Sequence, residues 1–339
     1  VTVGSAFALF AWRGPVLRGS GVFRPISREG GLLMNNFLLS VAAASVLLGT
    51  LYPLFLDVLD LGKVSVGAPY FNSVFVPLMT PMILIMGIGP LLNWKRGDAI
   101  IALQKLKIAA AIASIGAVTI WFVIDKATVL AAFGIGLALW LLISTLTELA
   151  NRIQLFRIPF YDTWRRIRHQ PRSSWGMTLA HAGLALAIAG MTASSAWRVE
   201  AIQTMKPGDS VIISGFNFTL RNVQNIKGPN YLASRGVFDV RRKQSFNITL
   251  EAEKRIYTVS RQPTTEAGIY STFLGDLYAV IGDPDAKGGF ITRLYFNPLV
   301  SWMWVGTLLM VLGAGISLSD RRHRVGAPAG RKVPGGVTA

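Results

Sequence analysis

The sequence predicts a polytopic α-helical membrane protein with a small all-β periplasmic domain inserted before the last transmembrane helix. Charged residues make up only 15% of the 339 residues and mean hydropathy is +0.46, whereas a soluble domain carries about 25% charged residues. Six apolar windows are long enough to cross the hydrocarbon layer, which needs about 20 helical residues. One polar stretch near the C-terminus carries short alternating apolar runs instead.

The first apolar stretch, 1–12, is too short to span a membrane and lacks the charged start and cleavage pattern of a signal peptide. We expect it to be a truncated helix whose beginning lies upstream. The transmembrane region that it opens extends over 1–196, and one further span follows the polar stretch. The predicted spans are 33–56, 73–94, 106–124, 128–149, 175–196 and 298–318. Only helices satisfy their own backbone polar groups in lipid, so each span is predicted to be helical.

The segments between the spans alternate between strongly basic ones and ones that are poor in basic residues. The basic segments are 13–30, 95–107, 151–174 and the tail 319–339. The intervening loops, 57–72 and 125–127, carry one lysine each. Because basic residues in short loops mark the cytoplasmic side, the tail is predicted to be cytoplasmic and the polar segment 197–297 periplasmic. The net charge of +17 thus reflects topology and attraction to anionic membrane lipid, and we expect no nucleic acid partner.

The polar segment 197–297 has the pattern of a small all-β domain. Residues 210–223 read as a strand pair or as one long bent strand. Further candidate strands are 236–240, 246–250, 255–259, 276–282 and 290–295. About six short strands separated by turn signals predict a β-sandwich or a partly open barrel. Such a module either offers sheet edges to an extended peptide or serves as a rigid spacer.

Histidine supplies the candidate chemistry, because the chain has no cysteine and therefore no disulfide, CxxC pair or thiolate metal site. His169 in a basic loop and His323 in the tail are expected to be solvated. His181 differs, since it lies inside the span 175–196, about 9 Å of helical rise beyond Trp175. An ionisable side chain in a span is costly and faces protein or a cavity.

Small residues surround His181. They are Ala180, Ala182, Gly183, Ala185, Ala187, Ala189 and Gly190. Small residues let another helix approach closely, and they would equally admit a flat macrocycle. Three roles stay open for His181: a hydrogen bond to a neighbouring helix, axial ligation of haem iron, or a proton relay. A haem iron with two axial protein ligands would need its second ligand from outside this chain.

Several long stretches together resemble the C-terminal half of the CcmF family of cytochrome c-type biogenesis proteins. They are PISREGGLLMNNFLL (25–39), WGMTLAHAGLALAIAG (175–190), QPTTEAGIYSTFLGDLYAVIGD (262–283) and LLMVLGAGISLSDRRHR (308–324). The resemblance implies a haem lyase component in the bacterial inner membrane. It would receive its substrate haem from the haem chaperone CcmE and work with a CcmH-type subunit that presents apocytochrome c, whose CxxCH cysteines become linked to the haem vinyl groups.

The resemblance also implies a resident haem b, held between two transmembrane histidines. Only His181 matches this pattern, as the second of the two axial ligands of the haem b iron. The other transmembrane ligand, two periplasmic histidines and a tryptophan-rich loop of the family have no counterpart in this sequence. We therefore expect the missing N-terminal half to be a partner and the chain alone to be inactive; the resemblance assigns no residue to the thioether chemistry.

Three alternatives differ from this interpretation. A related lyase component for multihaem nitrite reductase would share the fold and His181, and only its substrate would separate the two. A transporter of haem or lipid would show inverted repeats and polar residues at mid-membrane, and the sequence shows no repeat. A structural scaffold would tolerate replacement of His181.

Overall fold

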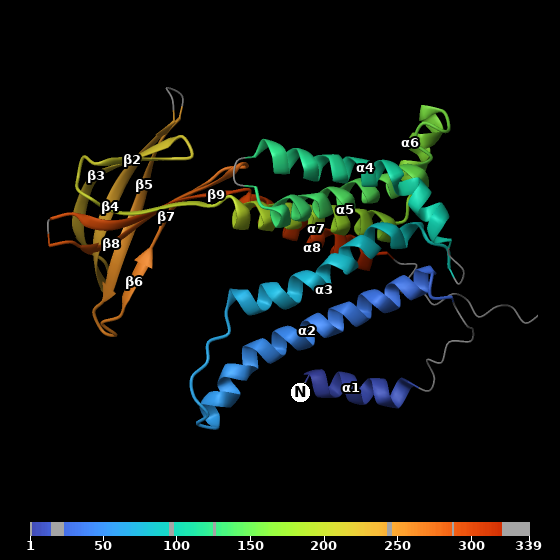
Figure 1. The fold of residues 1–339 in the computed structure, drawn as a ribbon, viewed down its shortest axis with the longest axis horizontal. Helices are drawn as coiled ribbons and strands as arrows, with labels where there is room; N and C mark the ends of the chain where they lie inside the picture. The colour runs from blue at the N-terminus through green and yellow to red at the C-terminus, as the bar shows by residue number, and fades with distance from the viewer. Residues whose placement is uncertain are drawn as a thin grey trace, which may run out of the picture. The chain divides into compact units, whose positions relative to one another are not determined.

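The structure is a computed structural model that describes residues 2–14, 24–94, 98–124, 127–242, 246–286 and 288–320. The chain divides into two compact units, 1–107 and 108–339, and each is described by itself. Helices occupy both units, and the second unit also contains every strand among the described residues (Figure 1). His323 and most of the predicted tail 319–339 lie outside the described residues.

Six described helices are long and apolar enough to cross a membrane, which confirms the predicted number of spans. The first unit holds α1 (Thr2–Arg13), α2 (Arg28–Val58) and α3 (Ala68–Ile88) with a 3-10 turn at Gly89–Leu91, and α4 (Ala99–Val123) continues into the second unit. The side chain of Ser27 caps α2 by accepting a hydrogen bond from the Gly30 amide. Helix α1 occupies the stretch predicted to be a truncated helix.

The second unit contains α5 (Val129–Ile153), α6 (Phe160–Arg168), α7 (Arg172–Ala196) and α8 (Val300–Leu318). Helix α6 was not predicted, because it is only nine residues long and lies in a segment dominated by arginine. Its charges stabilise a helix, because Asp162 in the first turn and the arginines in the last turn each interact favourably with the helix dipole. A helix this short cannot cross the membrane, so the flanking spans α5 and α7 run antiparallel.

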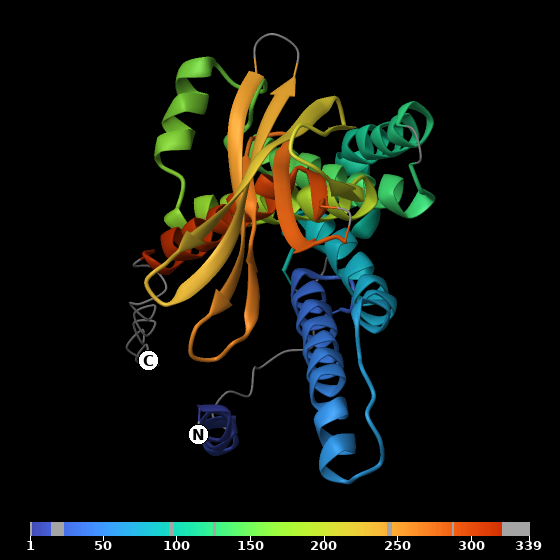
Figure 2. The same cartoon turned by 90° about the vertical axis from the view of Figure 1, so that its left-hand side faces the viewer.

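The domain between α7 and α8 is a β-sandwich of two antiparallel sheets, as the first of the two predicted alternatives required. One sheet has the order β1 (Val199–Met205), β9 (Phe290–Pro298), β8 (Gly275–Pro284), β7 (Gly268–Ser271). The other has the order β2 (Ser210–Ile213), β3 (Phe216–Lys227), β4 (Tyr231–Arg242), β5 (Phe246–Tyr257), β6 (Pro263–Glu266). Figure 2 looks onto this domain and shows the long strands β3, β4 and β5 running its length.

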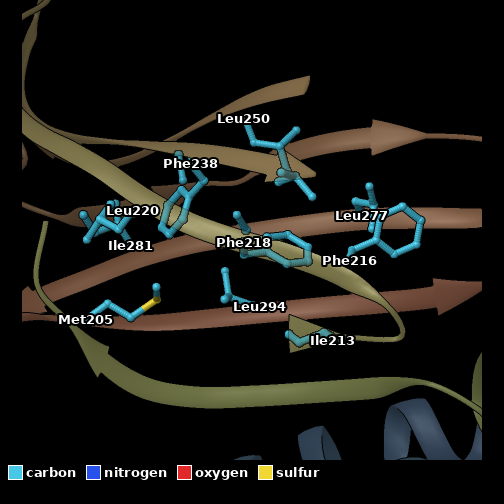
Figure 3. Close-up of a cluster of buried hydrophobic side chains, with 13 residues drawn as sticks. Met205, Ile213, Phe216, Phe218, Leu220, Phe238, Leu250, Leu277, Ile281 and Leu294 are labelled. Carbon is cyan, nitrogen blue, oxygen red and sulfur yellow. The ribbon is translucent and has the colours of Figure 1, made fainter. Parts of the chain in front are cut away.

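The sandwich core follows from alternation along the strands. Strand β8 alternates between buried and partly exposed residues over eight positions, as a strand with one face in a core must. Inward side chains from both sheets form one buried cluster (Figure 3). Its larger members are Met205, Phe216, Phe218, Leu220, Phe238, Leu250, Leu277, Ile281 and Leu294. A single apolar core therefore joins the two sheets.

The predicted strands differ from the observed ones in three ways. Residues 210–223 form a hairpin, β2–β3, whose turn at Ser214 and Gly215 has positive φ at both positions. Candidates 246–250 and 255–259 belong to one strand, β5, because the charged residues between them continue the pairing with β4. Strands β1, β6 and β7 were missed; β6 and β7 have four residues each, too few to show a period.

Candidate functional site

His181 lies on α7, which begins directly after Pro171 and runs unbroken to Ala196. The imidazole is half-buried, and no hydrogen bond joins it to another residue in the described parts of the chain. The hydrogen bond to a neighbouring helix that was one open alternative is therefore not formed by any described residue. Both ring nitrogens remain free to act as a donor, an acceptor or a ligand.

A seven-residue glycine repeat packs α7 against α8. Gly176, Gly183 and Gly190 lie on one side of α7. On α8, Gly306 lies against Gly183 and Gly313 lies against Gly176. A Cβ added at Gly183 would lie 2.5 Å from the Gly306 carbonyl oxygen, and one added at Gly313 would lie 2.6 Å from the Gly176 carbonyl oxygen. The two backbones are therefore in direct contact, as small residues permit in membrane helices.

The glycine side of α7 is consequently closed by α8. Among the small neighbours of His181, Ala180, Gly183, Ala187 and Gly190 contact α8 residues. His181 precedes Gly183 by two residues, and two residues turn a helix by about 200°. His181 thus lies on the far side of α7 from α8, and the glycines beside it in the sequence serve helix packing.

The side of α7 that carries His181 faces α5. Thr192 contacts this helix, since a Cβ added at Gly134 would lie 2.6 Å from the Thr192 hydroxyl oxygen. Eleven residues are close to three helical turns, so His181 shares the side of Thr192. Counting back along the antiparallel pair places Thr145 of α5 level with His181. The Thr145 hydroxyl is buried and donates to the Leu141 carbonyl at 2.7 Å within its own helix.

His181 is the residue of this region whose chemistry could hold a haem iron. The imidazole nitrogen of a histidine is a common axial ligand of haem iron. Ala185 follows one turn after His181 on the same side and is only 2% exposed, so this side of α7 is closely packed one turn further on. No described group of three or more His, Asp or Glu residues is arranged to hold a metal ion.

The remaining histidines have other surroundings. His169 is exposed at the end of α6, where its Nδ1 donates to the Arg165 carbonyl at 2.6 Å. This position agrees with the solvated role predicted for it. His323 lies outside the described residues.

A second candidate site, which the sequence did not reveal, covers the outer face of the four-stranded sheet. It is a hollow of about 630 Å³ lined by Arg198, Tyr278, Val280, Arg293, Tyr295 and Asn297, among others. The Tyr278 and Tyr295 rings lie 5.4 Å apart, and the Arg198 guanidinium lies 4.9 Å from the Tyr295 ring centre. The only signal was the alternation of Ile291, Arg293, Tyr295 and Asn297 along β9, which places them on one face.

Hydrogen bonding holds the polar groups of this face in place. The Tyr295 hydroxyl donates to Glu200 and, with Arg198, lowers the pKa of the Glu200 carboxyl against the opposing effect of burial. Burial and the Glu200 carboxylate raise the pKa of Tyr295. Glu200 is therefore ionised and Tyr295 neutral at pH 7. A face with aromatic rings and fixed charges of both signs has the chemistry of a protein-binding surface.

In the described part of the chain, six membrane-capable helices, a span histidine without a hydrogen bond to a described residue, and an inserted β-sandwich define a polytopic membrane protein with a folded domain outside the lipid. The family profile described as "CcmF C-terminal beta-sandwich" matches residues 196–298. The chain belongs to the CcmF family and corresponds to the C-terminal half of these cytochrome c-type biogenesis proteins.

Individual relatives support this assignment over nearly the whole chain. The cytochrome c-type biogenesis protein CycK of Rhizobium meliloti is 43% identical over 97% of this chain and 49% of its own length. CcmF of Escherichia coli is 37% identical over 96% and 48%, and NrfE of Haemophilus influenzae is 34% identical over 94% and 48%. The chain therefore spans about half the length of the curated relatives it matches.

A solved structure named "Cytochrome c Heme Lyase CcmF" has the same fold. It superimposes with a TM-score of 0.66 at 26% identity, over 88% of this chain and 46% of that one. This chain and that solved structure thus share the arrangement of spans and inserted sandwich.

Proposed function

We propose that this chain is the C-terminal part of a haem lyase of cytochrome c maturation, and that His181 is one axial ligand of its resident haem b. The observation that carries the proposal is the location of His181 and its lack of hydrogen-bond partners among the described residues. Its imidazole lies in a membrane span, is half-buried, has no hydrogen bond to a described residue and lies away from the helix contact that closes the other side of α7. An uncommitted ionisable group in lipid is costly unless it serves a site.

In this proposal the residues around His181 fix the ligand. The contact between α7 and α8, made by backbone against backbone, leaves α7 no room to rotate or slide. Leu141 and Thr145 of α5 are buried and exclude water on the side that His181 faces. The bound haem b would supply one-electron chemistry that keeps the iron of the substrate haem ferrous. The second axial histidine would come from the N-terminal half of the protein.

The same proposal assigns the sandwich to partner binding in the periplasm of a bacterium, with the spans in the inner membrane and the C-terminus cytoplasmic. The hollow around Tyr278, Arg293 and Tyr295 would orient the haem chaperone CcmE, a CcmH-type subunit or the apocytochrome c. This assignment requires residues 199–298 to face the periplasm, which cysteine labelling tests directly.

A lyase component for multihaem nitrite reductase is the second candidate, because NrfE of Haemophilus influenzae matches nearly as much of the chain as the CcmF relatives do. It would use the same histidine and the same sandwich. Complementation of a strain that lacks either system distinguishes the two substrates.

The haem assignment is tested by spectroscopy. The chain is co-expressed with the N-terminal half of a close relative, purified in detergent, and its reduced-minus-oxidised spectrum recorded. We expect His181→Ala to lose most of the b-type signal per mole of protein, because one of the two iron ligands is gone. His169→Ala serves as the matched control and should keep the full signal, since His169 is an exposed residue outside the spans.

An unchanged b-type haem content in His181→Ala would show that His181 is not the ligand. Equal helix content and equal elution of the two variants in gel filtration are needed, so that loss of haem is not loss of the fold.

A further inference from the structure

An aromatic pocket lies at the end of the sandwich that adjoins α7 and α8. It has a volume of about 520 Å³ and is lined by Phe216, Arg242, Phe246, Thr272, Phe273, Leu274 and Phe296. The rings of Phe216 and Phe296 are stacked with their centres 5.8 Å apart, and Phe246 meets Phe216 edge-on at 5.5 Å. The floor of the pocket is therefore the end of the apolar core, left open to one side.

The turn that forms the outer wall of the pocket is bound to the first turn of α8. The Leu299 amide and the Trp302 ring nitrogen donate to the carbonyls of Leu274 and Phe273, each at 3.0 Å. The Ser301 hydroxyl donates to the Thr272 carbonyl at 2.7 Å. The turn thus lies at the level where a membrane-spanning helix begins, which is the boundary between lipid and water.

Two large apolar side chains of this turn have no cover. Phe273 is 66% exposed and Leu274 is 67% exposed. The Phe273 ring lies 5.4 Å from the Trp302 ring in the first turn of α8, and Trp304 and Leu308 further along that helix are also exposed. Exposed apolar side chains at the start of a span are solvated by lipid at no cost, whereas in water their exposure would be unfavourable.

One positive charge stands at the rim of the pocket. The Arg242 guanidinium lies 4.7 Å from the centre of the Phe216 ring and forms no ion pair with a residue in the described part of the chain. Apart from Arg242, the one polar side chain among these lining residues is that of Thr272, whose hydroxyl donates to the Gly275 carbonyl at 2.6 Å. The site therefore combines an apolar cleft with a single unpaired cation.

We propose that this pocket binds an anionic phospholipid of the adjoining leaflet, with an acyl chain among the phenylalanines and the headgroup phosphate at Arg242. The position at the start of α8, the apolar lining and the unpaired guanidinium each match one part of that molecule. The bound lipid fixes the end of the sandwich against the membrane surface.

The test uses the whole chain in nanodiscs that contain a trace of photoactivatable phospholipid. Its acyl chain carries the photoreactive group, and cross-linked peptides are identified by mass spectrometry. We expect cross-links on the peptides that contain Phe246 and Phe273, and stronger cross-linking with phosphatidylglycerol than with phosphatidylcholine. Arg242→Gln should lower the phosphatidylglycerol signal about five-fold, the contribution of one basic residue near a charged surface, and lower the weaker phosphatidylcholine signal less.

Matched controls come from the loop at the opposite end of the sandwich, where Val259 is exposed and Arg261 lies two residues further on. Phe273→Ser should lose the cross-links with either lipid, whereas Val259→Ser and Arg261→Gln should keep them. Cross-links that avoid the pocket peptides, that are equal for the two lipids, or that persist in Phe273→Ser would overturn the proposal. So would cross-linking of the pocket to protein instead of lipid when a family N-terminal half is present.

Discussion

His181 illustrates which properties of a residue are local and which are not. Its presence in an apolar span and its small neighbours are visible in the sequence, and they sufficed to select it among the three histidines. The side of α7 on which it lies was not visible. That side depends on α8, which begins more than a hundred residues later, because the glycines of the two helices decide which face is closed.

Glu253 shows the opposite case, a charged residue that no sequence pattern singled out. It lies on β5, is only 6% exposed, and accepts hydrogen bonds from Arg235 at 2.7 Å and from Arg255 at 2.8 Å. Burial alone would raise the pKa of this carboxyl, but the two guanidinium groups outweigh burial and lower it below its ordinary value of 4.5. A buried carboxylate with two such partners stabilises the sheet.

The lowered pKa of Glu253 fixes a pH dependence. Because the carboxyl is a stronger acid in the folded chain, its contribution to stability is complete above pH 4.5 and is lost as pH falls through the folded value. We expect Glu253→Gln to destabilise the sandwich by about 1–3 kcal/mol at pH 7 and by progressively less below pH 4. Hydrogen exchange of the β4 and β5 amides in the intact chain, compared with wild type at each pH, measures this difference.

Glu266→Gln is the matched control. Glu266 also pairs with Arg255, at 3.3 Å, but its side chain is half-exposed, so the change should be below about 1 kcal/mol at every pH. Equal exchange in the Glu253 variant and wild type at pH 7 would show that the buried pair contributes nothing to the sheet.

At the scale of elements, the contact between α7 and α8 is encoded by spacing. Glycines recur every seven residues in both helices, and a seven-residue period keeps one face toward a neighbour over several turns. The repeat is present in the sequence, yet its meaning required knowing that the two helices are partners. Helix α6 was missed for a different reason, since nine residues with four charges carry no membrane signal.

Substitution within the glycine repeat should separate the two helices. Gly183→Leu would drive a side chain into the Gly306 carbonyl and the Met310 amide, which are backbone atoms that cannot move aside. We expect a loss of about 1–3 kcal/mol or more, the usual cost of overpacking, measured as a lower midpoint of heat-induced aggregation in detergent. Gly315→Leu on α8 is the control, because open space surrounds that position and the midpoint should stay within error. A midpoint equally high in both variants would exclude a rigid contact.

At the scale of the whole molecule, the sequence predicted the number of spans, the class of the inserted domain and its place before the last helix. These features depend on composition and period, which accumulate over many residues. Strand pairing and the two surface sites on the sandwich did not follow, because antiparallel partners such as β1 and β9 lie about ninety residues apart in the chain. Their chemistry appears only when the strands are side by side.

Orientation in the membrane is the whole-molecule property that remains a prediction. The natural absence of cysteine makes it directly testable, because single cysteines can be added without background. We expect Ser260→Cys, in an exposed sandwich loop, to react with an impermeant maleimide in cells whose outer membrane is opened. Arg166→Cys on α6 should react only after the inner membrane is broken. The reverse pattern would place the sandwich in the cytoplasm and remove its proposed partners.

The two chain crossings between helices and sandwich lie next to each other. Helix α7 passes into β1 through Trp197 and Arg198, β9 passes into α8 through Leu299, and β1 and β9 are paired from Val199 opposite Phe296 onward. A domain joined to the helices by a single strand could rotate about that connection, whereas two crossings that are paired to each other resist such rotation. The backbone contact that fixes α7 against α8 therefore also fixes β1 against β9, so the sandwich and the helix that carries His181 are held to each other through both crossings.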